Sequence, residues 1–129
     1  LTSIQIGHPS RNMGSCYIRF IPRNEMDIAV VGVGASLVLS EDQNRIESAR
    51  VALGAVAPTP LLVQAAGEML ASSLPTEETW NKVAIVAQSA ARPITDVRGG
   101  INQRKHLVGV LTKRALRKAY SRALGGMKQ

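Results

Sequence analysis

The chain of 129 residues has few aromatic side chains and a single cysteine. Phe, Trp and Tyr together make up 3% of it, which is little for a protein that binds single-stranded nucleic acid by stacking bases on rings. Cys16 alone can neither form an internal disulfide nor hold a metal, and this favours a reducing, cytoplasmic setting. Apolar runs fall well short of the ~20 residues that span a bilayer, so we expect no contact with a membrane.

Acidic side chains are missing from the C-terminal part of the chain. None follows Asp96, whereas nine basic residues do, although the net charge of the whole chain is only +7. Such an asymmetry favours an acidic partner for this segment, either a nucleic acid or a protein surface. One hypothesis for function is therefore a free-standing basic module that binds nucleic acid through the last helix, with Arg114, Lys118 and Arg122 as its contacts.

The first half of the sequence has the apolar pattern of strands. Alternating or continuous apolar residues predict strands over 4–6, 17–21, 28–39 and 46–57. Glycines within the third of these segments argue against a helix there. The polar stretch 40–45 is rich in turn-forming residues, so we expect the last two strands to form a hairpin.

In the second half, the apolar spacing changes from two residues to the spacing of helices. It predicts helices over 62–70, 76–91 and 101–124, the second of them capped at its start by Thr76. The side chains of the last helix that we expect to point inward are Val108, Leu111, Ala115 and Ala119. Strands followed by helices predict one α+β domain over 1–129: an antiparallel or mixed sheet of three to four strands covered by three helices, in a two-layer sandwich.

Residues that could carry catalysis are few. His8 and His106 lie far apart and have no neighbouring cysteine or pair of carboxylates, so no metal site is expected. Cys16, next to a predicted strand, is expected to be a small buried apolar residue rather than a nucleophile. Serine, histidine and aspartate show no spacing typical of a catalytic triad. We therefore expect no catalytic residues and no turnover by this chain alone.

Two glycine-containing segments could approach a phosphate. Residues 32–34 (GVG) resemble a fragment of a dinucleotide-binding motif, but the third glycine is missing and no helix follows. We expect these glycines to lie where another element packs close to the strand. Residues 99–100 precede the last helix, where free amides and Arg98 could bind an anion. The more ordinary interpretation is a turn in which Asp96 and Arg98 brace the start of the helix.

The segment 17–27 combines an aromatic ring, two arginines and two carboxylates just before a predicted buried strand. Tyr17 can cover the face of a flat cofactor, and Arg19 and Arg23 can meet its phosphates or polarise its ring. The alternative is a surface strand with ordinary ion pairs, and residue types alone favour that alternative.

Four separated runs, taken together and in this order, resemble one family. They are 23–31 (RNEMDIAVV), 52–60 (ALGAVAPTP), 96–99 (DVRG) and 104–108 (RKHLV). The chain is similar over essentially its whole length to the C-terminal domain of the FAD-binding (medium) subunit of molybdenum hydroxylases, the group of xanthine dehydrogenase and carbon monoxide dehydrogenase. Four motifs in order are more specific than any single one. The family's domain is α+β, in agreement with the order of strands and helices.

The resemblance implies a longer parent subunit whose FAD-binding N-terminal part is absent here. In that family a molybdenum cofactor in a large subunit oxidises the substrate, and two 2Fe–2S clusters in a small subunit carry electrons to FAD in the medium subunit. The C-terminal domain packs beside the flavin as a lid and docks to the partner subunits. Because most FAD contacts belong to the missing part, this chain alone is not expected to retain FAD.

The resemblance also implies roles for four residues. Tyr17 matches a tyrosine that shields the isoalloxazine ring, and Arg19 falls where a basic flavin contact lies. Arg23 and Asp27 belong to the segment whose charges lie near the ring. The turn at 43–44 lacks the glycine expected from relatives. The scarcity of aromatic residues and the lack of a known DNA-binding motif argue against the nucleic-acid hypothesis.

Overall fold

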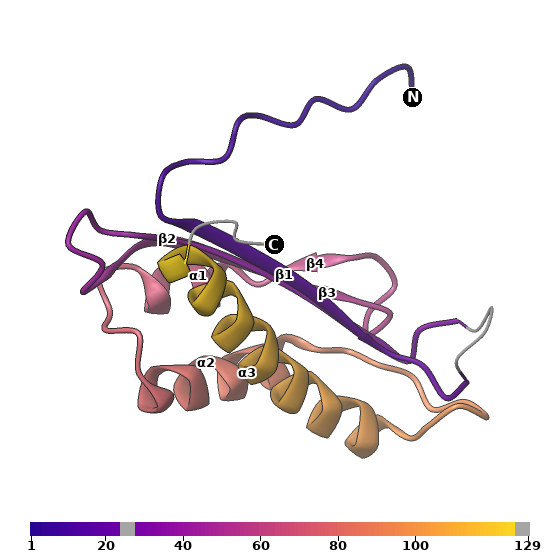
Figure 1. Cartoon of the computed structure of the whole chain (residues 1–129). Coiled ribbons are helices and arrows are strands. Elements are labelled where there is room, and N and C mark those ends of the chain that lie inside the picture. Colours follow the sequence, from indigo (N-terminus) through magenta and orange to yellow (C-terminus); the bar gives the residue numbers. More distant parts are fainter. Residues whose placement is uncertain (24–27, 126–129) are drawn as a thin grey trace.

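The structure of the chain, a computed structural model, describes residues 1–23 and 28–125. Four strands come first: β1 (Met13–Phe20), β2 (Val31–Leu39), β3 (Ile46–Gly54) and β4 (Leu61–Leu62). Three helices follow: α1 (Gln64–Leu70), α2 (Glu77–Ala90) and α3 (Ile101–Gly125). The strands form one antiparallel sheet in the order β1-β2-β3-β4, so the predicted α+β class is confirmed (Figure 1).

The helices lie on one side of the sheet and make a two-layer sandwich with it (Figure 1). α3 packs against β1 and β2, α1 packs against β3, and α2 lies against α3 and α1. We call the helix-covered side of the sheet the inner face and the opposite side the outer face. Within the described ranges no helix covers the outer face (Figure 1). No helix in those ranges is long and apolar enough to cross a membrane.

The core lies between the inner face and the helices. On β2 every second side chain from Val31 to Leu39 points inward and is buried. β3 adds Val51 and Leu53. Four side chains of α3 predicted to point inward are all buried: Val108, Leu111, Ala115 and Ala119. Cys16 is buried in the same core as a free thiol, which confirms the prediction that it is a small apolar residue.

The predicted hairpin between β2 and β3 forms, and its turn does without a glycine. Gln43 adopts a left-handed backbone with φ of 61°, a conformation that is uncommon for a residue with a side chain. Its Nε2 atom donates a hydrogen bond to Asn12 Oδ1 at 3.2 Å. Asp42 accepts hydrogen bonds from the Ser40 hydroxyl and the Asn44 amide, and these lower its pKa. Side-chain hydrogen bonds thus stabilise the turn that glycine would otherwise favour.

Three strand predictions need correction. The strand predicted over 4–6 is wrong: residues 1–10 have no regular structure, because no described strand lies alongside them to exchange hydrogen bonds. The first strand in the chain is β1, which begins at Met13, before the predicted start. The strand predicted over 28–39 begins three residues later, as β2.

The end of β3 and the start of α1 also differ from prediction. β3 ends at Gly54 because Ala55 turns into the left-handed region, with φ of 63°. The pair Leu61–Leu62 forms the short strand β4 beside β3, so α1 begins at Gln64. The ranges of α2 and α3 agree with prediction to within about a turn. Thr76 caps α2 as expected, its hydroxyl accepting a hydrogen bond from the Thr79 amide.

Candidate functional site

The outer face of the sheet carries side chains that the core does not use. Strand register places Tyr17 beside Gly34, and in the next outward-facing row it places Arg19 beside Gly32. Gly32 in turn pairs with Gly54 on β3. The outer face is therefore a strip of small residues on β2 and β3, bordered on β1 by an aromatic ring and a guanidinium group.

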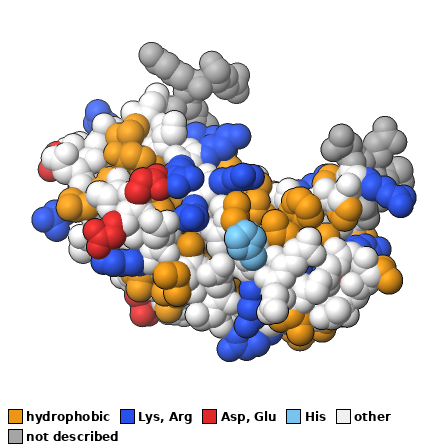
Figure 2. Space-filling model, turned by 90° about the horizontal axis from the view of Figure 1, so that it is seen from below, with side chains coloured by type: hydrophobic (Ala, Val, Ile, Leu, Met, Phe, Trp, Pro, Cys, Tyr) orange, Lys and Arg blue, Asp and Glu red, His pale blue; other side chains and the backbone are white. Residues whose placement is uncertain are grey.

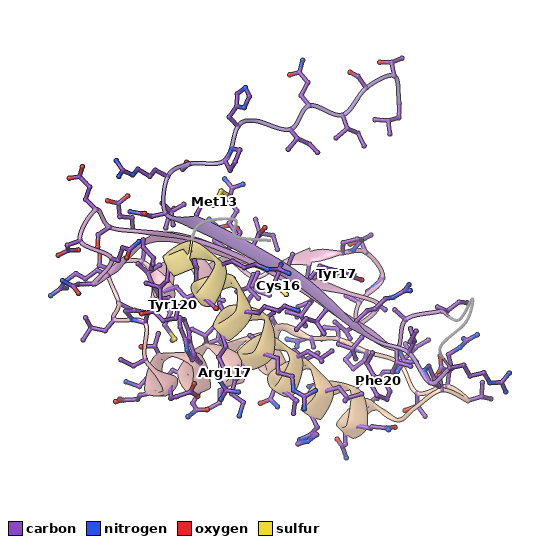
Figure 3. The ribbon with its side chains drawn as sticks, in the orientation of Figure 1. Met13, Cys16, Tyr17, Phe20, Arg117 and Tyr120 are labelled. Carbon is purple, nitrogen blue, oxygen red and sulfur yellow. The ribbon has the colours of Figure 1, made fainter. Side chains whose placement is uncertain are left out.

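The ring of Tyr17 leans across β2 over the two glycines. A Cβ atom at position 32 would lie 2.6 Å from the Tyr17 hydroxyl oxygen and 3.2 Å from Cε2, whereas one at position 34 would lie 3.8 Å from Cδ2. Gly32 is thus required for the position of the ring, which still leaves Tyr17 64% exposed. We had expected another element to pack close to these glycines. The element is β1, and the contact is a single ring on the outer face; Figure 3 labels Tyr17 on this strand, next to the inward-facing Cys16.

Of the other predicted site residues, the structure describes Arg19 and Arg23, and it brings only Arg19 onto the outer face with Tyr17. Arg19 is two residues from Tyr17 on β1, which places the two side chains on the same face, and it is exposed. Arg23 is exposed in the segment that follows β1. Asp27 lies outside the described residues.

A buried arginine that we did not single out holds this end of the sheet together. Arg104, at the start of α3, is 4% exposed. Its Nη1 atom donates to the carbonyl oxygens of Val30 and Ala55, both at 3.2 Å. Its Nη2 atom donates to Asp96 Oδ1 at 2.6 Å, and this hydrogen bond lowers the pKa of Asp96. We call this arrangement the Arg104 clamp, because it joins the start of β2, the end of β3 and the loop before α3.

The sequence does contain a signal for the clamp. The inward stripe of α3 runs through Val108 and Leu111, and one turn earlier the same stripe reaches Arg104. An arginine on an otherwise apolar stripe requires buried acceptors, which here are two carbonyl groups and one carboxylate. Basic residues of this helix were considered only as an outer face, so the inward one was missed.

The turn before α3 favours the ordinary interpretation over the anion site. Asp96 Oδ1 accepts a hydrogen bond from the Arg98 amide at 2.9 Å, and Asp96 and Gly99 exchange backbone hydrogen bonds. A Cβ atom at position 99 would lie 2.8 Å from Gln103 Oε1, so a side chain of α3 already occupies that space. The turn therefore braces the start of the helix, mainly through Asp96 and Arg104.

The chemistry available on the outer face is that of contact rather than catalysis. An exposed ring next to a guanidinium, on a surface of small residues, can receive a flat and electron-rich group. Within 1–23 and 28–125, no group of three or more His, Cys, Asp or Glu side chains could hold a metal ion. Fold and site together define a two-layer α+β domain whose sheet has one face covered by helices and one face that carries an exposed ring.

Comparisons with known proteins identify the family. The family of CO dehydrogenase flavoprotein C-terminal domains matches residues 17–119. The carbon monoxide dehydrogenase medium chain of Afipia carboxidovorans is 30% identical over 123 residues, which cover 95% of this chain and 42% of that protein. The xanthine dehydrogenase FAD-binding subunit of Escherichia coli is 29% identical over 118 residues, covering 91% of this chain and 39% of that subunit.

Solved structures agree with the sequence comparisons. The cyanide-inactivated Cu,Mo-CO dehydrogenase superposes with a TM-score of 0.81 and 27% identity, over 88% of this chain and 39% of that one. Quinoline 2-oxidoreductase from Pseudomonas putida gives a TM-score of 0.80 at 27% identity, over 87% of this chain and 38% of that one. The chain belongs to the family of CO dehydrogenase flavoprotein C-terminal domains, and it spans about two fifths of the length of these relatives.

Proposed function

We propose that this chain is the C-terminal domain of the flavin subunit of a molybdenum-dependent hydroxylase, and that its outer face covers the isoalloxazine ring of FAD. The observation that carries the proposal is Tyr17, a largely exposed ring held in place over Gly32 on a face that no described helix covers. Relatives named as a CO dehydrogenase medium chain and as a xanthine dehydrogenase FAD-binding subunit support it.

The shape of the outer face supports this proposal. The ring of Tyr17 fills the space above Gly32 and leaves no room there for a Cβ atom, so no side chain of β2 stands up between that ring and a flat ligand. Bound FAD would supply a ring system that accepts electrons. Tyr17 would shield one side of it from water, and Arg19 would place a positive charge near its electron-rich edge. Arg23 and Asp27 complete the proposed set.

The proposal assigns no chemical step to this chain. The electrons would come from a molybdenum cofactor in a large subunit through two 2Fe–2S clusters in a small subunit, and the chain would dock to both. The remaining FAD contacts would lie in the N-terminal part of the same subunit, so residues 1–129 alone would hold FAD poorly. Cys16, buried and unpaired, is compatible with the cytoplasmic location that we propose for the enzyme.

The test is truncation of Tyr17 in the enzyme that carries this chain. Tyr17→Ala should weaken flavin retention up to about tenfold, since ring contacts of this kind contribute about 0.5–1.5 kcal/mol. Tyr17→Phe, which keeps the ring, should change retention little. The measurements are the flavin content of the purified enzyme and the dissociation constant of FAD from its fluorescence. Equal flavin content and equal rates of flavin reduction in all three proteins would contradict the role of Tyr17.

A matched pair of arginines tests the charge. Arg19→Ala removes a cation beside Tyr17. Arg50→Ala also removes a cation from the outer face, but Arg50 pairs with Ser36, four positions along β2 from Gly32, the partner of Arg19. Only the first should shift the flavin absorption spectrum and its reduction potential. If both variants behave alike, the outer face around Tyr17 is not the flavin contact.

A further inference from the structure

The side of the molecule opposite the sheet has a groove between α2 and α3. Side chains at helical spacing on each helix line it. From α2 these are Asn81, Ala84, Ile85, Gln88 and Ser89. From α3 these are Asn102, Lys105, His106, Gly109, Val110 and Lys113. Two hollows, of about 350 and 330 Å³, share Ile85, Gln88 and His106 and so form one continuous α2–α3 groove.

Gly109 allows the groove floor to form. A Cβ atom there would lie 2.4 Å from Gln88 Nε2, so the Gln88 side chain packs directly on the backbone of α3. At one end, Arg117 Nε donates to Glu77 Oε1 at 2.7 Å, and this ion pair ties the two helices together. The groove therefore has a floor formed by direct helix–helix contact, and it is a feature of two packed helices rather than of a loop.

The groove is positively charged, with one exposed apolar side chain at its centre. Lys105 and Lys113 line it, and among the described residues no carboxylate does. Lys105 makes no ion pair with any residue that the structure describes, whereas Lys113 adds to the effect of Arg117 in lowering the pKa of Glu77 on α2. Ile85, in the middle, is 62% exposed. In Figure 2, which views this side, the acidic side chains lie in the left half, and basic and hydrophobic ones extend over the rest.

Contacts within the chain engage other basic residues of α3. Arg104 forms the clamp, Arg117 binds Glu77, and Arg122 donates to the Ser15 carbonyl oxygen on β1. Lys105 and Lys113 remain directed to the groove. Arg114 and Lys118 are exposed on another side of the helix and do not line the groove. The positive charge of α3 that is available to a partner thus lies in two places: Lys105 and Lys113 in the groove, and Arg114 and Lys118 on another side of the helix.

We propose that the α2–α3 groove binds an acidic, amphipathic segment of another polypeptide, a helix with two carboxylates about two turns apart and an apolar side chain between them. Lys105 and Lys113 are eight residues apart, or about 12 Å along α3, which sets that spacing. The apolar side chain would cover Ile85, as in other helix-in-groove complexes. A nucleic acid fits less well, because no Phe, Tyr or Trp side chain of the described residues lines the groove for stacking and an exposed isoleucine lies at its centre.

The partner is identified by a photocrosslink from the groove. A benzophenone amino acid replaces Ile85 in the assembled enzyme, and a second protein carries it in place of Arg114 as the matched control. We expect position 85 to crosslink to a segment of another subunit in which acidic residues outnumber basic ones, and position 114 not to reach that segment. A crosslink to nucleic acid, to a second copy of this chain or to a basic segment would overturn the proposal, and so would the absence of any crosslink.

Two pairs of substitutions test the charge contribution. Lys105→Ala with Lys113→Ala should weaken subunit association about tenfold at low salt, because each exposed ion pair contributes little but two are lost. Arg114→Ala with Lys118→Ala removes the same charge from the same helix and should leave association unchanged. Equal losses in both proteins would mean that only the overall charge of α3 matters, and the groove would not be the site.

The identity of the partner as a subunit of the same enzyme rests on the proposed function, and the two can fail separately. The crosslink and the association measurement do not depend on flavin. A flavin-free protein that crosslinks from position 85 to an acidic segment would overturn the proposed function and keep the groove. If Tyr17→Ala weakens flavin retention as expected but position 85 gives no crosslink, the proposed function stands and the groove proposal is overturned.

Discussion

On the inner face of the sheet β2 presents Val33, Ala35 and Leu37, each at most 4% exposed beneath α3, whereas on the outer face the same strand presents Gly32 and Gly34 beneath a tyrosine ring. The inner residues follow from folding alone, since burying branched apolar side chains stabilises the sandwich. The outer residues do not, because glycine weakens a strand and an exposed ring adds little stability. This difference between the two faces is what the proposed flavin contact at the outer face requires: a flat surface with an exposed ring, kept at some cost in strand stability.

The largest expected effect tests whether side chains on the two faces differ in their contribution to the free energy of unfolding as they do in exposure. Leu53, on the inner face, is 1% exposed, and Leu62, on the outer side of β4, is 61% exposed. Leu53→Ala should lower the free energy of unfolding by about 3 kcal/mol through lost burial and an internal cavity. Leu62→Ala should change it by less than about 0.5 kcal/mol. Urea-induced unfolding of the chain measures both.

The two leucines serve as controls for each other, because the same atoms are removed from neighbouring strands. A loss at Leu62 as large as that at Leu53 would mean that the outer face is packed in solution, and the comparison of faces would fail. A small effect of Leu62→Ala on stability, together with a loss of flavin in the assembled enzyme, would extend the proposed contact surface from β1 to β4.

The parts of the fold that could be predicted from the sequence are those with long local patterns. α2 and α3 have several turns of regular apolar spacing, and Thr76 defines the start of α2. The strand predicted over 4–6 had the right alternation, but a strand also needs a neighbour, and local pattern does not supply one. β4 is only two residues long and forms because β3 offers it hydrogen bonds.

The candidate site was predictable only in part. Residue types alone drew attention to Tyr17 and Arg19, and the structure places both on the outer face. Why positions 32 and 34 are glycines depends on strand register, which places them under the ring of Tyr17, 15 and 17 positions earlier in the chain. The Arg104 clamp joins three segments from different parts of the chain, and only its position on the inward stripe was visible beforehand.

A moderate effect is expected from a methyl group placed under the ring. Gly32→Ala would put a Cβ atom 2.6 Å from the Tyr17 hydroxyl oxygen, so the ring must move away from β2. In a Tyr17→Phe protein the hydroxyl is gone and the nearest ring atoms lie 3.2 Å from that Cβ atom, which needs only a small shift. We expect a coupling free energy of about 1 kcal/mol between positions 17 and 32 from a double-mutant cycle in urea.

Gly34→Ala is the matched control for the same ring. Its Cβ atom would lie 3.8 Å from Tyr17 Cδ2, an ordinary contact, so coupling with Tyr17→Phe should be near zero. Equal coupling at both glycines would mean that the ring does not lean toward Gly32. In the assembled enzyme, Gly32→Ala should also reduce flavin retention, as Tyr17→Ala does. Adding Tyr17→Phe to Gly32→Ala should restore part of that retention.

The smallest expected effect concerns the Arg104 clamp, which supports the end of the sheet where the outer face carries Arg19. The hydrogen bond from Arg104 holds the pKa of Asp96 below its ordinary value of 3.8. A carboxylate with a lowered pKa in the folded state stabilises the fold above its ordinary pKa, and this contribution is lost as the pH falls through the folded value. Asp96→Asn should therefore flatten the decline of stability below about pH 4. Urea unfolding at successive pH values from 6 to 3 measures the slope.

The control for this prediction removes the donor instead of the acceptor. Without the guanidinium, the main cause of the lowered pKa is gone, so in an Arg104→Met protein the further change Asp96→Asn should leave the slope below pH 4 nearly unaltered. A flattening of the same size in both backgrounds would mean that the Arg98 amide, rather than Arg104, controls the carboxylate. The loop before α3 would then be held by its own turn, and the outer face would be supported by β2 and β3 without help from the helix.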